Sequence, residues 1–269
     1  MKHFLLLSAA CLVALGMPTP STAQESTEQQ TPYWYASYFS IDWTRTDSLT
    51  KLWKLTEPVR ELQKENGEIL EWLGLVHHTG NEQNVVVMTK YPSWKAINAQ
   101  SDALESVFPN AAERARLNDG FNWVFGAAPH QDVIYRESPG AIMPSAEDPT
   151  EDTFWYAAYY EIPLVRTDSL NKLWAINADV AKEAKRNGSI LGTVSLVHHT
   201  GVHHATVVTL TKYPSWEALE VQSWNGAQQA VEPDSSRRAE INAGFTYVFQ
   251  DEGTGLVPHY DVIYIQPTK

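Results

Sequence analysis

An internal duplication constrains the fold of this chain more than any other feature of its sequence. Four blocks recur in the same order in the two halves of the chain. With the first copy before the second, they are YWYASYF and FWYAAYY at 33–39 and 154–160, RTDSL at 45–49 and 166–170, HHTG at 77–80 and 198–201, and TKYPSW at 89–94 and 211–216. Because the blocks keep their order, the two halves are expected to form the same structural unit.

The duplicated blocks divide the chain into four parts. The first repeat takes residues 24–137, and the second repeat takes residues 153–269. The segment 138–152 between them is rich in Pro, Gly, Ser and acidic residues and has no apolar period, which is typical of a linker. Residues 1–23 precede the first repeat and have no counterpart in the second.

Residues 1–23 have the pattern of an export signal. A lysine near the start is followed by the apolar run FLLLSAACLVALGM and then by STA, whose small residues fit a signal peptidase site. We therefore expect export to the periplasm or the medium, with a mature chain that begins at Gln24. The apolar run is shorter than the roughly 20 residues that cross a bilayer, so we expect no membrane association after cleavage.

Composition narrows the classes of partner and chemistry. Cys11 is the only cysteine and lies inside the predicted signal, so the mature chain is expected to have no disulfide and no cysteine nucleophile. The formal net charge of −12 disfavours nucleic acid and anionic lipid as partners. The sequence has no Gly-rich phosphate loop, HExxH, GxSxG or EF-hand loop. A small molecule is therefore the expected partner, no cofactor is specified, and homo-oligomer formation stays open.

The residue pattern predicts the same order of elements in each repeat: strand, helix, strand, strand, helix, strand. In the first repeat the predicted strands are 33–41, 69–78, 84–91 and 130–135. A first helix is expected to begin at Asp47 or Ser48 and to end at Asn66-Gly67, and a second begins near Trp94 and is interrupted at Pro109. Residues 121–125 are expected to add a short strand. This βαββαβ order is that of a ferredoxin-like unit.

Both faces of the predicted strands are apolar or aromatic. In 33–41, Trp34 and Tyr38 fall on one face and Tyr35 and Phe39 on the other, because neighbouring side chains of a strand alternate. A ferredoxin-like sheet is covered by helices on one face only, so the second face needs another layer. The sheet of the other repeat is expected to supply it.

Element order and duplication together resemble the dimeric α/β-barrel superfamily in its fused form, in which two ferredoxin-like units pack sheet to sheet. The resemblance implies an α+β fold with an intrachain pseudo-dimeric α/β barrel. The superfamily includes haem-degrading and cofactor-free monooxygenases, isomerases, haem peroxidases and ligand-binding proteins. The fold therefore leaves the function open.

Pairs of histidines end the same predicted strand in both repeats. They are His77 with His78 and His198 with His199, and the second repeat adds His203 and His204 across the turn. Since neighbours in a strand face opposite sides, one member of each pair is expected to face the space between the sheets.

The histidine pairs have a functional and a structural interpretation. In the functional one, His77 and His198 act as acid/base groups of a pocket at the strand ends, and His78 and His199 bind the ligand, since a buried imidazole needs a partner. In the structural one, Thr-Gly sets the turn and the histidines pack at the strand end.

A metal site is the third interpretation of these residues. His198 or His199 could approach His203 or His204 across the turn and begin a Zn, Cu or haem site, although a further ligand would be required. The first repeat has Asn81 and Glu82 where the second has the extra pair, so this site would not be duplicated.

A second constellation stands at the start of the last strand of each repeat. His130-x-Asp132 and His259-x-Asp261 place a histidine and a carboxylate on one face, where the carboxylate could orient the ring for proton transfer. The structural alternative is a solvent-facing histidine and a strand-entry aspartate.

Aromatic residues of the first strands could line a ligand pocket. They are Trp34, Tyr38, Trp155 and Tyr159. The structural alternative is that they form the core between the sheets.

Three functions are compatible with these patterns. The first is an exported small-molecule-binding protein or enzyme, with proton-transfer or monooxygenase-like chemistry in a pocket between the two repeat sheets. The second is a histidine-based metal or haem protein, and the third is a non-catalytic exported interaction module. The substrate, the active member of each histidine pair and the oligomeric state are not specified by the sequence.

Overall fold

The computed structural model describes residues 31–79, 83–126, 128–145, 147–149, 152–201, 203–221, 224–251 and 255–267. The predicted signal at 1–23 and the turn at Gly80, with Asn81 and Glu82, lie outside these residues. Within the described ranges, no helix combines the length and apolar character needed to cross a membrane.

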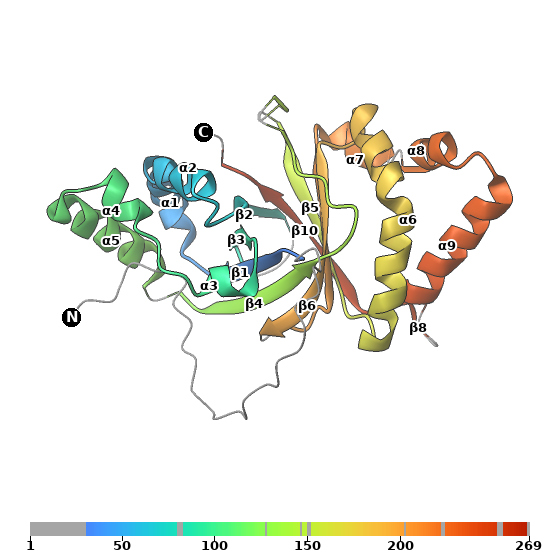
Figure 1. The fold of residues 1–269 in the computed structure, drawn as a ribbon, viewed down its shortest axis with the longest axis horizontal. Coiled ribbons are helices and arrows are strands. Elements are labelled where there is room, and N and C mark those ends of the chain that lie inside the picture. The colour runs from blue at the N-terminus through green and yellow to red at the C-terminus, as the bar shows by residue number, and fades with distance from the viewer. Residues whose placement is uncertain are drawn as a thin grey trace.

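Each repeat forms a four-stranded antiparallel sheet with helices on its outer face (Figure 1). The first repeat contains β1 (Tyr33–Phe39), α1 (Thr46–Leu55), α2 (Glu57–Glu65), β2 (Glu71–Thr79), β3 (Val85–Tyr91), α3 (Trp94–Ile97), α4 (Ala103–Val107), α5 (Ala111–Phe125) and β4 (His130–Glu137). The second contains β5 (Phe154–Tyr160), α6 (Thr167–Arg186), β6 (Gly192–Gly201), β7 (Val207–Tyr213), α7 (Trp216–Val221), α8 (Trp224–Val231), α9 (Ser235–Phe249), the short hairpin β8 (Gln250–Asp251) with β9 (Gly255–Leu256), and β10 (His259–Ile265). The strand orders β4-β1-β3-β2 and β10-β5-β7-β6 confirm the predicted ferredoxin-like units.

The two sheets join at their edges into one closed barrel, in the order β1-β3-β2-β10-β5-β7-β6-β4. Two antiparallel pairings connect the repeats: β2 with β10, and β4 with β6. We call these pairings the seams. The helix layers of the two repeats lie on opposite outer sides of the barrel (Figure 1). The predicted fused α/β barrel is therefore confirmed.

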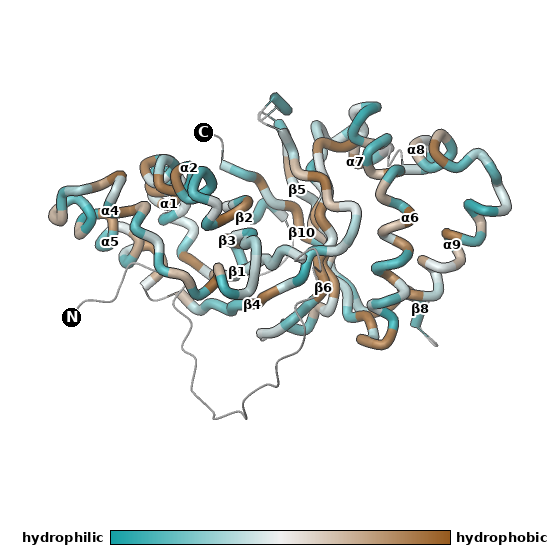
Figure 2. Tube along the Cα trace, in the orientation of Figure 1, coloured by the Kyte–Doolittle hydropathy of each residue, from teal (hydrophilic) through white to brown (hydrophobic). Residues whose placement is uncertain are grey.

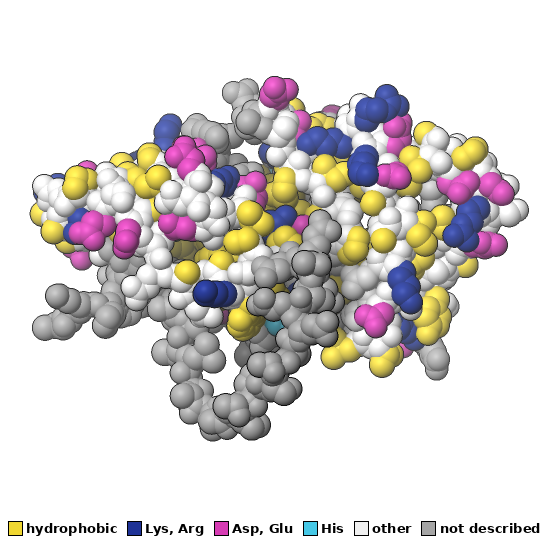
Figure 3. All heavy atoms as spheres, viewed as in Figure 1, with side chains coloured by type: hydrophobic (Ala, Val, Ile, Leu, Met, Phe, Trp, Pro, Cys, Tyr) yellow, Lys and Arg dark blue, Asp and Glu magenta, His cyan; other side chains and the backbone are white. Residues whose placement is uncertain are grey.

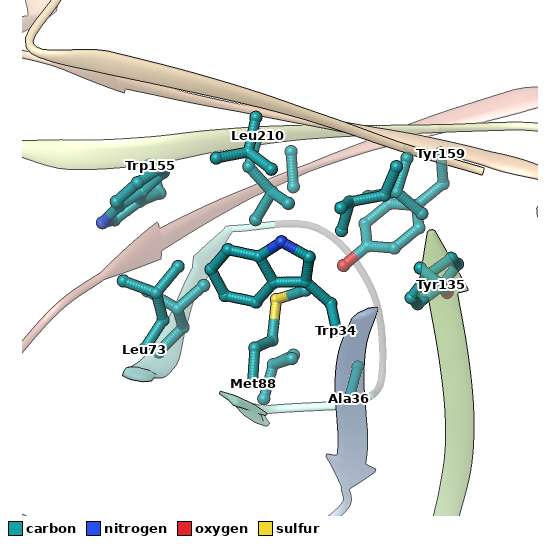
Figure 4. Close-up of a cluster of buried hydrophobic side chains, with 14 of the residues drawn as sticks. Trp34, Ala36, Leu73, Met88, Tyr135, Trp155, Tyr159 and Leu210 are labelled. Atoms are coloured by element: carbon teal, nitrogen blue, oxygen red, sulfur yellow. The ribbon is translucent and has the colours of Figure 1, made fainter. Parts of the chain in front are cut away.

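The inward faces of both sheets form one buried cluster that fills the barrel (Figure 4). Trp34 and Tyr38 of β1 lie opposite Trp155 and Tyr159 of β5, and each of the four is at most 2% exposed. Hydroxyls are paired across neighbouring strands: Tyr38 with Tyr135, and Tyr159 with Tyr264, both at 3.1 Å between oxygens. Both repeats thus satisfy the same buried polar groups in the same way.

The outer faces of the sheets pack against the helices, so the strands are buried on both sides as the sequence predicts. Figure 2 shows apolar residues both on the barrel strands and on the helix turns that face them. On the face shown in Figure 3, acidic and basic side chains are interspersed over the helices of both repeats. The net negative charge is therefore not gathered into one acidic patch on this face.

Two of the recurring blocks, HHTG and TKYPSW, meet at the seams. His77 pairs with Tyr264 and His198 pairs with Tyr135, each beside a register shift of the seam. The second histidine of each pair packs against the tryptophan that begins a helix of the other repeat. His78 lies 5.8 Å from Trp216 and His199 lies 5.3 Å from Trp94, measured between ring centroids.

Two local predictions differ from the structure. Residues 121–125 belong to α5 rather than to a strand, because Asn110 caps a helix that continues through this segment. The first predicted helix is divided at Thr56 into α1 and α2, because Pro58 has no N–H to continue the hydrogen-bond ladder. The second repeat has Asp179 at the equivalent position, and α6 is one continuous helix of 20 residues.

The seam should be sensitive to a side chain at Gly201. Its φ of +121° is a conformation that favours glycine, and an added Cβ would lie 2.5 Å from the carbonyl oxygen of Asp132. We predict that Gly201→Ala lowers the free energy of unfolding by about 2 kcal/mol in urea denaturation. Gly226→Ala is the matched control, because no atom lies within 4 Å of an added Cβ there. Equal stabilities of the two variants would contradict this description of the seam.

Candidate functional site

A cavity of about 440 Å³ lies between the outer face of the first repeat's sheet and its helices. We call it the first-repeat cavity. Its floor comes from β1, β3 and β4, and its other walls come mainly from α1, α2 and α5. Its aromatic lining consists mainly of Phe39, Trp53, Trp72, Tyr91, Phe121 and Phe125. We expected a pocket between the two sheets, but tryptophan and tyrosine side chains fill that space, and this cavity lies on the opposite face.

A polar network lines this cavity, and the side chains of His130 and Asp132 in it are 50% and 40% exposed. Ser37 of β1 and Asp132 of β4 are direct partners in the sheet, and Ser37 Oγ donates to Asp132 Oδ1 at 2.6 Å. His130 Nε2 lies 3.6 Å from the other carboxylate oxygen, Oδ2. The His130 ring also stacks on Phe39, with centroids 5.3 Å apart. The predicted His-x-Asp pair of the first repeat thus lies on one face and lines a cavity.

Tyr35 extends the network along β1. Burial raises the pKa of the Tyr35 phenol well above its ordinary value, and the charge of Asp132 and hydrogen bonding to that carboxylate raise it further. The phenol therefore stays protonated at any physiological pH and donates its proton to the Asp132 carboxylate. The floor combines a carboxylate, an imidazole and a phenol O–H.

A stacked group forms one wall of the cavity. The Arg60 guanidinium lies over the Trp72 ring at 4.0 Å, and Trp72 meets Trp53 edge to face at 5.3 Å between centroids. Arg60 also donates to the Trp53 carbonyl at 2.6 Å and to Thr56 Oγ1 at 2.9 Å. Burial lowers the pKa of Arg60 to about 10, so the side chain remains a cation. The break at Thr56 thus holds a positive charge against an aromatic wall.

The equivalent region of the second repeat has different chemistry. Its strand carries Ala158 where the first has Ser37, and its helix carries Ala181 where the first has Arg60. Asp261 therefore has no serine at this position to hold it. Burial raises the pKa of Tyr156, and hydrogen bonding to Asp261 and its charge raise that pKa further. His259 Nδ1 approaches the Val257 carbonyl oxygen at 3.3 Å instead of a carboxylate. The two predicted His-x-Asp pairs are thus not equivalent.

The seam histidines lie outside the first-repeat cavity. His77 is half-buried between Trp43 and Tyr264, with ring centroids at 5.8 and 6.4 Å. His198 is half-buried and its Nε2 lies 3.2 Å from the Gly201 carbonyl oxygen, within its own turn. Burial lowers the pKa of His199, which packs beside Tyr33 and Trp94. These contacts favour the structural interpretation of the HHTG blocks.

His203 packs against tyrosines of the barrel interior. The Ala205 backbone N–H donates to its Nδ1 at 3.1 Å, so in the neutral ring Nε2 carries the proton and donates to Tyr260 Oη, also at 3.1 Å. The ring stacks on Tyr38, with centroids 5.1 Å apart. His204 beside it is exposed. Among the described residues, no three histidine, cysteine or acidic side chains gather in a group that could hold a metal ion.

The four aromatic residues predicted as ligand contacts are core residues of the barrel. Trp34, Tyr38 and Tyr159 belong to the interior cluster, as does Trp155, which also borders a second cavity. Three further residues that line the first-repeat cavity were not among the candidates from the sequence: Tyr35, Ser37 and Arg60. A comparison of the copies could have found two of these, since Ser37 and Arg60 are polar where the second repeat has alanine.

Acid should destabilise the fold through His203. Burial lowers its pKa from 6.5 to about 4, so between these values the unfolded chain binds a proton that the folded chain does not. Stability should therefore fall as pH decreases through this window, by about 3 kcal/mol from this residue. We predict that His203→Asn removes this part of the pH dependence in urea denaturation, whereas His204→Asn keeps it. Identical pH profiles of the two variants would contradict the assignment.

The comparisons with known proteins bear on the fold. No protein-family model and no curated protein sequence matches the chain. A candidate monooxygenase from Lactobacillus acidophilus NCFM has a similar structure, with a TM-score of 0.52 and 9% identity over 89% of this chain and 95% of that one. A candidate monooxygenase from Fusobacterium nucleatum subsp. nucleatum ATCC 25586 has a TM-score of 0.50 and 11% identity over 90% of this chain and 94% of that one. At these identities the likeness shows the fold alone: the chain is a dimeric α/β barrel in its fused, two-repeat form, and no specific family is identified.

Proposed function

We propose that the first-repeat cavity binds a small, largely apolar molecule and that His130, assisted by Asp132, transfers a proton at it. The observation that carries the proposal is the His130–Asp132 pair in the lining of an aromatic cavity, with Nε2 and Oδ2 3.6 Å apart and both side chains open to solvent. Histidine is suited to this task because its ordinary pKa is close to neutral pH.

Each group of the floor has a distinct role in this proposal. His130 accepts a proton from the ligand, and the Asp132 carboxylate stabilises the imidazolium that results. Ser37 holds the carboxylate in place through its 2.6 Å hydrogen bond. Tyr35, whose raised pKa keeps it protonated, donates its O–H to the Asp132 carboxylate and helps to hold it in place. A phenol or an enolisable carbonyl compound has the required combination of acidic proton, oxygen and apolar body.

Monooxygenase-like chemistry is the second candidate. Loss of a proton from a phenol or enol gives an electron-rich anion. In an oxygen-dependent enzyme, this anion would then react with dioxygen. The fold shared with two candidate monooxygenases keeps this extension open, although a shared fold does not by itself imply a shared reaction. A non-catalytic interaction module would not require a cavity with an ordered polar floor.

The two repeats provide a matched test with 2-naphthol, an aromatic alcohol whose anion absorbs at longer wavelength. We predict that the protein binds 2-naphthol and raises its anionic fraction near neutral pH, because His130 accepts the phenolic proton. His130→Gln should reduce the anionic fraction about tenfold or more in absorbance titrations. His259→Gln, which changes the equivalent residue of the second repeat, should have no effect.

The contrast between the two variants decides the proposal. Equal spectra for His130→Gln and His259→Gln, or a wild-type protein that leaves the naphthol spectrum unchanged, would overturn it. Oxygen uptake by the bound anion, measured with an electrode, separates the monooxygenase candidate from proton transfer alone.

We also propose that the protein is exported, on the basis of the signal-like sequence at 1–23. Expression of the full chain in a bacterial host should deliver a protein that begins at Gln24 to the periplasm or medium. Mass spectrometry of the fractionated protein tests this. An uncleaved chain that stays in the cytosol would contradict it.

A further inference from the structure

A second cavity, also of about 440 Å³, lies between α1 and α2 of the first repeat and the connecting residues Met143, Pro144, Ser145 and Asp148. Trp53, Trp72 and Arg60 line both this cavity and the first-repeat cavity, so the stacked group separates the two. Gly74 leaves room for this wall, because a Cβ there would meet the Trp72 ring. Lys212, from the end of β7, contributes to the far side of the second cavity.

In the first repeat, a carboxylate neutralises the lysine at this strand position. Lys90, the counterpart of Lys212, ends β3 and forms an ion pair with Glu137 at 2.7 Å. Trp34 Nε1 donates to the same carboxylate at 2.7 Å. The carboxylate thus takes both an ammonium and an indole N–H, and the buried charges of this repeat are balanced.

The second repeat keeps the lysine and the tryptophan but lacks the carboxylate. Gln266 stands where the first repeat has Glu137, and it accepts from Trp155 Nε1 at 3.3 Å. Lys212 is only 5% exposed, yet within the described part of the chain its ammonium has no hydrogen bond and no ion pair. A mostly buried lysine without a partner is costly, and this one borders the second cavity, where its ammonium keeps some contact with solvent.

Two of the carboxylates that line the second cavity, Asp148 and Glu71, are paired with other lysines. Asp148 forms an ion pair with Lys185 at 3.2 Å and accepts from the Ser145 backbone N–H at 2.6 Å. Glu71 pairs with Lys64 at 2.8 Å. Burial lowers the pKa of Lys212, and Asp148 only partly opposes this effect. The Lys212 ammonium therefore lacks a counter-ion that an anionic ligand in the cavity could supply.

We propose that the second cavity binds an organic carboxylate, whose anionic group takes beside Lys212 the place that Glu137 occupies beside Lys90. The other walls suit the rest of such a molecule, since Leu73, Met143, Pro144 and Trp155 are apolar. A compact carboxylate with an aromatic or aliphatic body matches this combination. This site is independent of the proton-transfer chemistry proposed for the first-repeat cavity.

Benzoate is the probe, and benzamide is its uncharged analogue of the same shape. In isothermal titration calorimetry, the wild-type protein should bind benzoate more tightly than benzamide. Lys212→Met, which keeps the length of the side chain and removes its charge, should weaken benzoate binding about tenfold or more and leave benzamide unchanged. Lys182→Met, at an exposed lysine, is the control for non-specific charge effects.

Gln266→Glu gives a second and stricter test. It restores the carboxylate of the first repeat, so Lys212 should form an internal ion pair that raises the thermal midpoint and abolishes benzoate binding. No benzoate binding by the wild-type protein, or equal affinities for wild type, Lys212→Met and Gln266→Glu, would overturn the proposal. His130→Gln should leave benzoate binding unchanged, which separates this site from the first-repeat cavity.

Discussion

The two seams are the interaction on which the rest of this structure depends. A four-stranded sheet with apolar side chains on both faces cannot stand alone, because its helices cover only one of them. Pairing of β2 with β10 and of β4 with β6 closes the barrel, buries the second face of each sheet and removes its free edges. At each seam, a histidine of one repeat also packs on a tryptophan of the other, which adds a side-chain contact to the backbone pairing.

Closure also explains where the cavities lie. Trp34, Trp155 and the paired tyrosines are large side chains that pack together inside the barrel, so the space between the sheets is core. Space remains on the outer face of the first sheet, where Pro58 divides the covering helix and Arg60 stacks on Trp72. The second cavity extends from there to Leu73 and Trp155 at the border of the interior cluster. The continuous helix α6 in the second repeat lacks this break.

The fold could be predicted from the sequence because duplication and alternation act over whole strands. The element order and the two-sided burial of residues such as Trp34 and Tyr35 follow from local pattern. The roles of the histidine pairs could not be predicted, because they depend on which strand edge meets which. His78 meets Trp216 only after the barrel has closed. The His130–Asp132 pair could be predicted from the sequence because both residues lie on one strand. Ser37 and Arg60 come from other elements.

Hydrogen exchange at the seams tests the central claim that one closed barrel, rather than two associated repeats, is the cooperative unit. Amides of β2, β4, β6 and β10 that cross the seams should exchange with the same free energy as amides within β1 and β5, because opening a seam exposes the whole interior cluster. Exchange of the seam amides at a distinctly lower free energy, with β1 and β5 still protected, would show that the repeats separate as independent units and would contradict the account.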